Sequence, residues 1–152
     1  VAEWRPVKEF TLAAAPRAQW ASDPLLAYEE FSGGNFTIGR GFDPGAVIGD
    51  SGAAVSLEAR LGSLVPANTR KFALQPFAFF DAAWVWNKDS AFNGLNPQKL
   101  YSAGGGVRVT YGDLGRLDLT LAAPLNRPAL LAKRPDPRLL VTLTTQFGVR
   151  AR

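Results

Sequence analysis

The segment AAVSLEARLG, residues 53–62, carries the pattern that decides the fold of this chain. Every second residue, starting with Ala53, is apolar, and the positions between them include Ser56, Glu58 and Arg60. Successive side chains of a β-strand point to opposite faces of the sheet. The alternation therefore predicts a strand with one apolar face and one polar face, on which Glu58 and Arg60 are expected to form a charge ladder.

The same period of two recurs along the chain. Apolar residues make up 47% of the 152 residues, yet the mean hydropathy is −0.02, because apolar and polar positions are interleaved. The 15 glycines and 11 prolines disfavour long helices, and no run approaches the ~18 apolar residues of a membrane-spanning helix. We expect an all-β, antiparallel protein with about six strands, at residues 8–21, 52–63, 71–87, 100–112, 115–125 and 138–150.

The connections between these strands differ in length in a regular way. Short turns are expected at residues 63–71 and 111–116, and long loops at 22–51, 87–99 and 126–138. Short turns at one end of an antiparallel sheet and long loops at the other are typical of transmembrane β-barrels. An interfacial aromatic girdle would be formed by residues at strand ends beside a long loop, namely Trp84, Trp86 and Tyr101. A soluble β-sandwich would also alternate and is the alternative of a different class.

The strand at residues 71–87 indicates which side chains face the inside of such a barrel. If Asp81 faces the polar interior, the alternation places Gln75, Phe77 and Phe79 beside it. The large apolar residues of the other face would then contact lipid, namely Phe72, Leu74, Phe80, Trp84 and Trp86.

The composition argues against catalytic, metal-binding and nucleic-acid-binding functions. The chain has no cysteine and no histidine, so it lacks any disulfide and the commonest general base and transition-metal ligand. The spacing of Asp43 and Asp50 does not match an EF-hand loop, and the glycines at 104–106 lack the sequence of a phosphate-binding loop. Small residues there would leave room in the lumen or allow a bend. The net charge of +4 is scattered. We expect no enzyme activity, cofactor, metal or nucleic-acid partner.

The loop at residues 22–51 holds Arg40 between Gly39 and Gly41. An arginine in a loop commonly serves only solubility, and the residues alone leave that interpretation open. The flanking glycines also permit a tight tip with φ > 0. Close approach to a wall would let the guanidinium bind a carboxylate with two parallel hydrogen bonds.

This region resembles the signature region of the Omp85 superfamily, and more closely that of the TpsB transporters of two-partner secretion, the hemolysin and hemagglutinin secretion/activation proteins. The matching elements, in order, are Pro24-Leu25-Leu26, Glu30-Phe31, Gly33-Gly34, Arg40-Gly41-Phe42, Gly49-Asp50-Ser51-Gly52, Glu58-Ala59-Arg60 and Phe79-Phe80-Asp81-Ala82-Ala83. Two residues depart from the family pattern, since Gly39 stands where valine is usual and Ala83 stands where glycine is usual.

The resemblance implies that residues 1–152 form the C-terminal part of an outer-membrane β-barrel of about 16 strands, within a longer precursor that also carries periplasmic POTRA domains. It further implies that residues 22–51 fold into the lumen, where Arg40 meets Asp81. The implied site comprises the loop tip Arg40, Gly41 and Phe42, the wall residues Asp81 and Phe79, and the supporting residues Gly33, Gly34, Gly49, Asp50, Gly52, Glu58 and Arg60.

The implied function is the export of a partner protein across the bacterial outer membrane, with the loop as a plug, brace or gate. The implied partners are a secreted cargo protein, outer-membrane lipid and the remaining barrel strands, from the same precursor or another chain. An insertase that assembles other outer-membrane barrels is the alternative within the superfamily.

Overall fold

The computed structural model describes residues 1–34, 38–68, 71–89, 91 and 94–145. These residues form β-strands joined by turns and loops, without an α-helix in the described ranges. Accordingly, no helix among them is long and apolar enough to cross a membrane.

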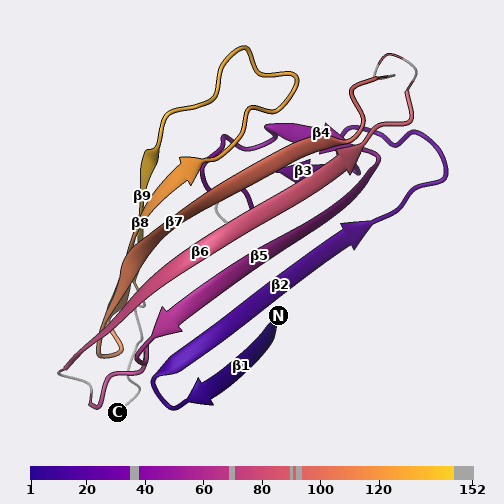
Figure 1. The fold of residues 1–152 in the computed structure, drawn as a ribbon. Helices are drawn as coiled ribbons and strands as arrows, with labels where there is room; N and C mark the ends of the chain where they lie inside the picture. The colour runs from indigo at the N-terminus through magenta and orange to yellow at the C-terminus, as the bar shows by residue number, and fades with distance from the viewer. Residues whose placement is uncertain (35–37, 69–70, 90, 92–93, 146–152) are drawn as a thin grey trace.

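Seven strands form one antiparallel sheet in the order β1-β2-β5-β6-β7-β8-β9 (Figure 1). Their bounds are β1 (Ala2–Val7), β2 (Phe10–Gln19), β5 (Ser51–Leu61), β6 (Phe72–Trp86), β7 (Gln98–Tyr111), β8 (Gly115–Pro124) and β9 (Arg138–Thr145). Two short strands, β3 (Phe31–Gly33) and β4 (Val47–Gly49), pair with each other inside the long β2–β5 connection. The shorter turns lie at one end of the sheet and the long loops at the other, which confirms the predicted asymmetry (Figure 1).

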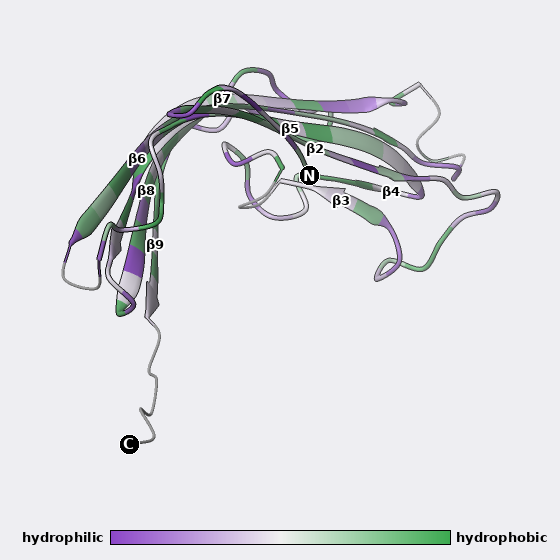
Figure 2. Ribbon diagram, turned by 90° about the horizontal axis from the view of Figure 1, so that it is seen from below, coloured by the Kyte–Doolittle hydropathy of each residue, from purple (hydrophilic) through white to green (hydrophobic). Residues whose placement is uncertain are grey.

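The sheet is strongly curved, and β3 and β4 lie on its concave side (Figure 2). The face assignment of β6 is confirmed, because the residues predicted to point inward are buried, namely Gln75, Phe77, Phe79 and Asp81. The residues predicted to face lipid are exposed or half-buried, namely Phe72, Leu74, Phe80, Trp84 and Trp86. Trp84 packs edge-on against Tyr101 of β7, with 5.8 Å between the ring centroids.

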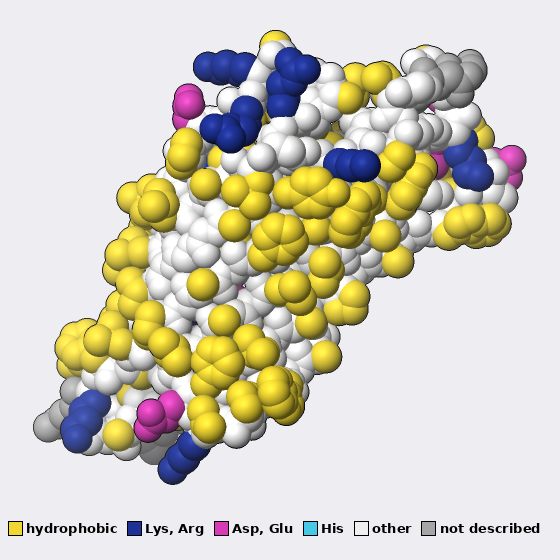
Figure 3. Space-filling model, viewed as in Figure 1, with side chains coloured by type: hydrophobic (Ala, Val, Ile, Leu, Met, Phe, Trp, Pro, Cys, Tyr) yellow, Lys and Arg dark blue, Asp and Glu magenta, His cyan; other side chains and the backbone are white. Residues whose placement is uncertain are grey.

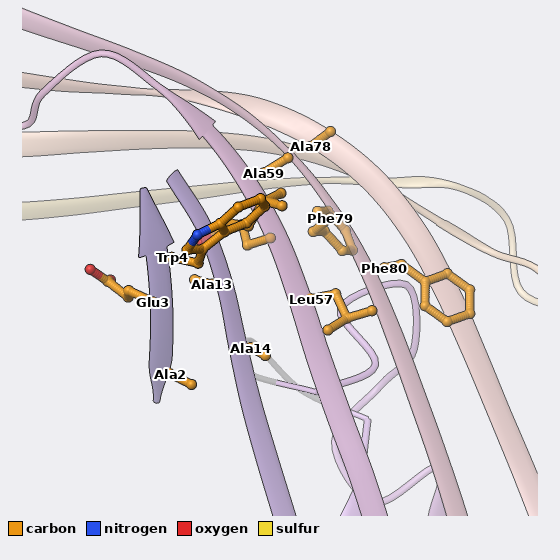
Figure 4. Close-up of a pocket in the computed structure, with 12 residues that line it drawn as sticks. Ala2, Glu3, Trp4, Ala13, Ala14, Leu57, Ala59, Ala78, Phe79 and Phe80 are labelled. Carbon is orange, nitrogen blue, oxygen red and sulfur yellow. The ribbon is translucent and has the colours of Figure 1, made fainter. Parts of the chain in front are cut away.

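The convex face carries a broad band of hydrophobic side chains (Figure 3). A soluble sandwich would cover such a face with a second sheet. In the described part of the chain, the other sheet is the small β3–β4 pair on the concave side, so these residues do not have the architecture of a β-sandwich. On β1, β2, β5 and β6 small alanines and larger apolar side chains, among them Trp4, Leu57 and Phe80, line an open groove (Figure 4).

The main hydrophobic core lies between the β3–β4 hairpin and the concave face. Phe31, Phe42 and Val47 of the β2–β5 connection are almost fully buried and pack with residues of β5, β6 and β7. The loop is therefore packed on the sheet like a second layer, and apolar burial of this kind stabilises by roughly 1.5–3 kcal/mol per large side chain.

The strands differ from expectation in two respects, and one expectation lies partly outside the described residues. The sheet has seven strands where about six were expected, because β1 was not predicted. The three-residue strands β3 and β4 were also missed, since they are too short to show a period of two. The strand expected at 138–150 is present as β9 up to Thr145, and its last part, with Phe147, lies outside the described residues.

Candidate functional site

The Asp81 side chain on β6 is the point at which the loop meets the sheet. It is fully buried and accepts hydrogen bonds from the backbone N–H groups of Gly39 and Arg40, at 3.0 and 3.1 Å. Its two oxygens also accept from Nε and Nη2 of Arg40, at 3.1 and 2.9 Å. The hydroxyl of Ser102 on β7 lies 3.4 Å away. One carboxylate thus fixes both the backbone and the side chain of the loop tip.

The Arg40 guanidinium is held on several sides at once. Besides Asp81, it donates to the carboxylate of Glu58 at 3.3 Å and to the hydroxyl of Ser56 at 3.0 Å, both on β5. Its Cζ atom lies 3.6 Å from the centre of the Phe79 ring, a cation–π geometry. Arg40 is only 7% exposed, so this is a buried and fully partnered charge. We call Arg40, Ser56, Glu58, Phe79 and Asp81 the arginine site.

Glu58 connects the arginine site to the rest of the concave face. It accepts from Arg60 at 2.8 Å and from Arg108 of β7 at 2.5 Å, in addition to Arg40. Arg60 continues to Glu3 on β1 at 2.7 Å, and Arg108 continues to Gln75 on β6 at 3.3 Å. The predicted charge ladder of Glu58 and Arg60 is therefore present and extends across the sheet. Buried charges need such partners, because an unpaired one costs several kcal/mol.

The turn around Arg40 depends on glycine for two different reasons. Gly39 has φ of 85°, in the left-handed region where a β-branched residue is strained, and an added Cβ would lie 2.5 Å from the Leu100 side chain. A valine at this position would therefore be strained in this conformation and would clash with Leu100. Gly41 does not have positive φ, contrary to one reading of the sequence; an added Cβ there would meet the backbone of Pro124 at 2.7 Å. The N–H of Phe42 donates to the Gly39 carbonyl at 2.9 Å and closes the turn.

Asp50 holds the base of the loop. Its carboxylate is 3% exposed and accepts from the backbone N–H groups of Leu25, at 2.5 Å, and Lys88, at 2.7 Å. The N–H of Lys88 contributes most to keeping the pKa of Asp50 below its usual value, and the N–H of Leu25 acts in the same direction against the effect of burial. Asp50 thereby joins both ends of the β2–β5 connection to the β6–β7 connection, at the end of the sheet that carries the long loops.

The other predicted glycines are places where chain segments touch. An added Cβ at Gly33 would lie 2.9 Å from the Val47 side chain, and Gly34 has φ of 94°. Gly49 lies against Val85 and the backbone of β6, and Gly52 lies under the Phe31 ring. The structure thus brings the tip, the wall residues and Glu58 into one cluster, with Arg60 attached to it through Glu58. The supporting residues Asp50, Gly49 and Gly52 lie at the loop base.

Sequence reasoning missed three members of this network, namely Ser56, Ser102 and Arg108. Each lies on the polar face of its strand, and Arg108 is the register partner of Gln75 while Ser102 is the partner of Asp81. Correct strand pairing combined with face parity would have found them. Among the described residues no group of three or more acidic, histidine or cysteine side chains is arranged to hold a metal ion. The oxygens of Asp81 and Glu58 bind arginine and backbone N–H groups, an arrangement suited to holding a loop in place.

Comparison with known protein families matches residues 4–147 to the Omp85 superfamily domain. No curated protein matches this chain. The match covers both the curved sheet and the loop that carries Arg40, and it agrees with the motif resemblance seen in the sequence. Members of the superfamily are outer-membrane proteins of bacteria that act in protein transport or insertion. This chain belongs to the Omp85 superfamily.

Proposed function

We propose that this chain is part of a transporter that exports a partner protein across the outer membrane, and that the loop at residues 22–51 is its gate. The observation that carries the proposal is the docking of Arg40, which makes five hydrogen bonds to the sheet from a loop that crosses the concave face. A loop in this position occupies the path of a polypeptide through a barrel. Export then requires that the loop has a defined docked position from which it can move.

Within the superfamily we assign the chain to the TpsB type of two-partner secretion. The support is the run Pro24-Leu25-Leu26 and Glu30-Phe31 in the first part of the loop. The structure gives parts of this run a role, because the N–H of Leu25 is bound by Asp50 and Phe31 is fully buried beneath the hairpin. The run therefore anchors the loop to the end of the sheet that carries the long connections.

The proposed partners follow from the surfaces of the sheet. The apolar convex face would contact outer-membrane lipid (Figure 3). In the described residues β1 and β9 are the outer strands of the sheet, each paired on one side. Unpaired backbone groups in hydrocarbon cost several kcal/mol each, so we propose that further strands complete the barrel at these edges. The cargo would be an unfolded secreted protein that passes along the concave side.

The test is an export assay with Arg40→Ala in the intact protein in its own outer membrane. Undocking leaves the loop without a fixed position in the lumen, so we expect export to fall by about tenfold or more, which corresponds to about 1.4 kcal/mol. The amount of folded protein in the membrane should be unchanged. Arg116→Ala is the matched control, because Arg116 faces the same side but is 39% exposed in its side chain and pairs with Asp118 at the surface.

Two outcomes would contradict the proposal. Normal export by the Arg40→Ala variant would leave the loop as a structural element rather than a gate. A fall in the folded amounts of other outer-membrane barrels, with export of the partner protein unchanged, would point to the insertase function found in the same superfamily.

A further inference from the structure

The three consecutive glycines of β7, Gly104 to Gly106, lie directly beneath the aromatic residues of the concave face. An added Cβ at Gly104 would lie 2.9 Å from Cε1 of Phe79, and one at Gly106 would lie 3.0 Å from Cζ of Phe77. Both positions also approach the backbone carbonyls of β8 too closely for any side chain. Glycine within a strand often marks such a close approach.

An arginine guanidinium lies over each of these rings. The Cζ atom of Arg40 lies 3.6 Å from the centre of the Phe79 ring, and that of Arg108 lies 3.9 Å from the centre of the Phe77 ring. Each stack therefore brings together a glycine, a phenylalanine ring and a guanidinium. The first stack ends on Asp81 through Arg40, and the second ends on Glu58 through Arg108.

The same combination occurs a third time at the base of the loop. The Phe31 ring lies on Gly52, with Cε1 2.8 Å from an added Cβ, and Cζ of Arg17 lies 4.8 Å from the ring centre. This third stack joins the loop to β5 and β2 without using the Arg40 pair. Three separate stacks of one kind indicate that the glycines give the rings room to lie close to the strands, in addition to the room that β8 requires at Gly104 and Gly106.

We propose that Gly104 and Gly106 are positioning residues for the docked loop. A side chain at position 104 would push the Phe79 ring away from β7 by at least a few tenths of an ångström, and the guanidinium stacked on it would move off Asp81. A side chain at position 106 would act in the same way through Phe77 and Arg108 on Glu58. Hydrogen bonds of this kind weaken steeply with misalignment. The glycines of β7 thus set the position of the gate above the sheet. The ion pairs of Arg40 itself are made to Glu58 on β5 and Asp81 on β6.

The inference can be tested by labelling a single cysteine beneath the docked loop, since the chain contains no cysteine of its own. Ala54 on β5 is 5% exposed and packs in the core cluster with Phe31 and Phe42. In an Ala54→Cys background, a small thiol reagent reaches the sulfur only when the loop leaves the sheet. The labelling rate of the folded, membrane-embedded protein therefore measures loop opening.

We expect Gly104→Ala, Gly106→Ala and Phe79→Leu to raise the labelling rate by about tenfold or more, equivalent to about 1.4 kcal/mol. Phe79→Tyr keeps a ring on Gly104 and should label at the parent rate. Because the Cβ at position 104 would also meet the Leu121 carbonyl of β8, the control is a double variant. In a Phe79→Leu background no aromatic ring remains to be displaced, so Gly104→Ala should add less than about twofold to the labelling rate. A direct effect of the contact with β8 would add the same factor in both backgrounds.

Phe79→Leu leaves the β7 backbone intact, so the test survives if Gly104→Ala does not fold. Parent-like labelling of Phe79→Leu, or an effect of Gly104→Ala that is as large in the Phe79→Leu background as in the parent, would overturn the inference. The inference rests on the proposed function only in calling the docked loop a gate. The labelling assay measures loop opening and does not depend on export. Raised labelling with normal export by Arg40→Ala would refute the gate and keep the stacks. Parent-like labelling of the glycine and Phe79 variants, with impaired export by Arg40→Ala, would refute the stacks and keep the gate.

Discussion

Replacing Asp81 by asparagine changes the charge of the arginine site without changing its volume. Oδ2 of Asp81 accepts from the N–H groups of Gly39 and Arg40, from Nε of Arg40 and from the Ser102 hydroxyl. Oδ1 accepts from Nη2 of Arg40. An asparagine can offer an oxygen at only one of these two places, and its NH₂ group then faces an N–H donor at the other. The less damaging orientation keeps the oxygen at the Oδ2 position and loses the bond to Nη2.

The free-energy cost follows from leaving Arg40 buried with one carboxylate fewer. Removing one partner of a buried ion pair costs about 3–5 kcal/mol. Glu58 still lies 3.3 Å from Nη1 of Arg40, so we take the lower end, about 3 kcal/mol. This penalty falls on the docked state, because an undocked arginine in water needs no partner. The loop-open population should therefore rise by about a hundredfold.

The assay is the labelling of the Ala54→Cys reporter, with Asp43→Asn as the matched control. Asp43 lies on the same loop and pairs with Arg138 at 3.0 Å, but its side chain is 81% exposed. An exposed pair is worth at most about 1 kcal/mol, so labelling of the control should change by less than about fivefold. If Asp81→Asn labels no faster than Asp43→Asn, the docked loop does not depend on the Asp81 charge and the reasoning fails.

Two further predictions concern the other contacts of the loop. Asp50→Asn should speed amide hydrogen exchange at Leu25 and Lys88 at neutral pH. Because these N–H groups lower the pKa of Asp50, its carboxylate stabilises the docked loop above pH 3.8, and this stabilisation is lost as the pH falls through the lowered pKa. Below that pKa the variant and the parent should exchange at the same rate. A difference that persists in strong acid would refute the assignment. Phe42 is 1% exposed, so Phe42→Ala should cost the docked loop about 3–5 kcal/mol of stability and raise Ala54→Cys labelling by more than about a hundredfold. Parent-like labelling would show that Phe42 does not hold the loop.

The parts of the fold that depend on local alternation were predictable from the sequence. The inward direction of Asp81 follows from the period of two in β6 alone, and it was confirmed. The contact between Arg40 and Asp81, 41 residues apart in sequence, could not come from alternation. It came from the motif resemblance, and the structure contains it.

The parts that depend on strand register were not predictable in the same way. Arg108 reaches Glu58 only because β7 pairs with β6 in the register that places Arg108 opposite Gln75. The role of Gly104 depends on the position of the Phe79 ring on the neighbouring strand. A single strand pattern contains neither relation, because a shift of one residue in register would send every side chain to the other face. The glycine run was therefore predicted to leave room in the lumen or to allow a bend, and the structure places the rings of Phe77 and Phe79 against it.

The combination of contacts explains how one loop can be held in a single position and still be released. The apolar contacts of Phe31 and Phe42 favour docking but fix its register only weakly, since apolar burial is non-directional. The Arg40 pair adds little net free energy, because docking removes from water the same charges that it brings together. Misplacing the loop, however, would leave Asp81 or Arg40 buried without a partner, which is expensive. The ion pair therefore determines where the loop docks more than how tightly it docks. A water-filled lumen would solvate both charges when the loop moves, so the charges would penalise wrong positions without preventing release.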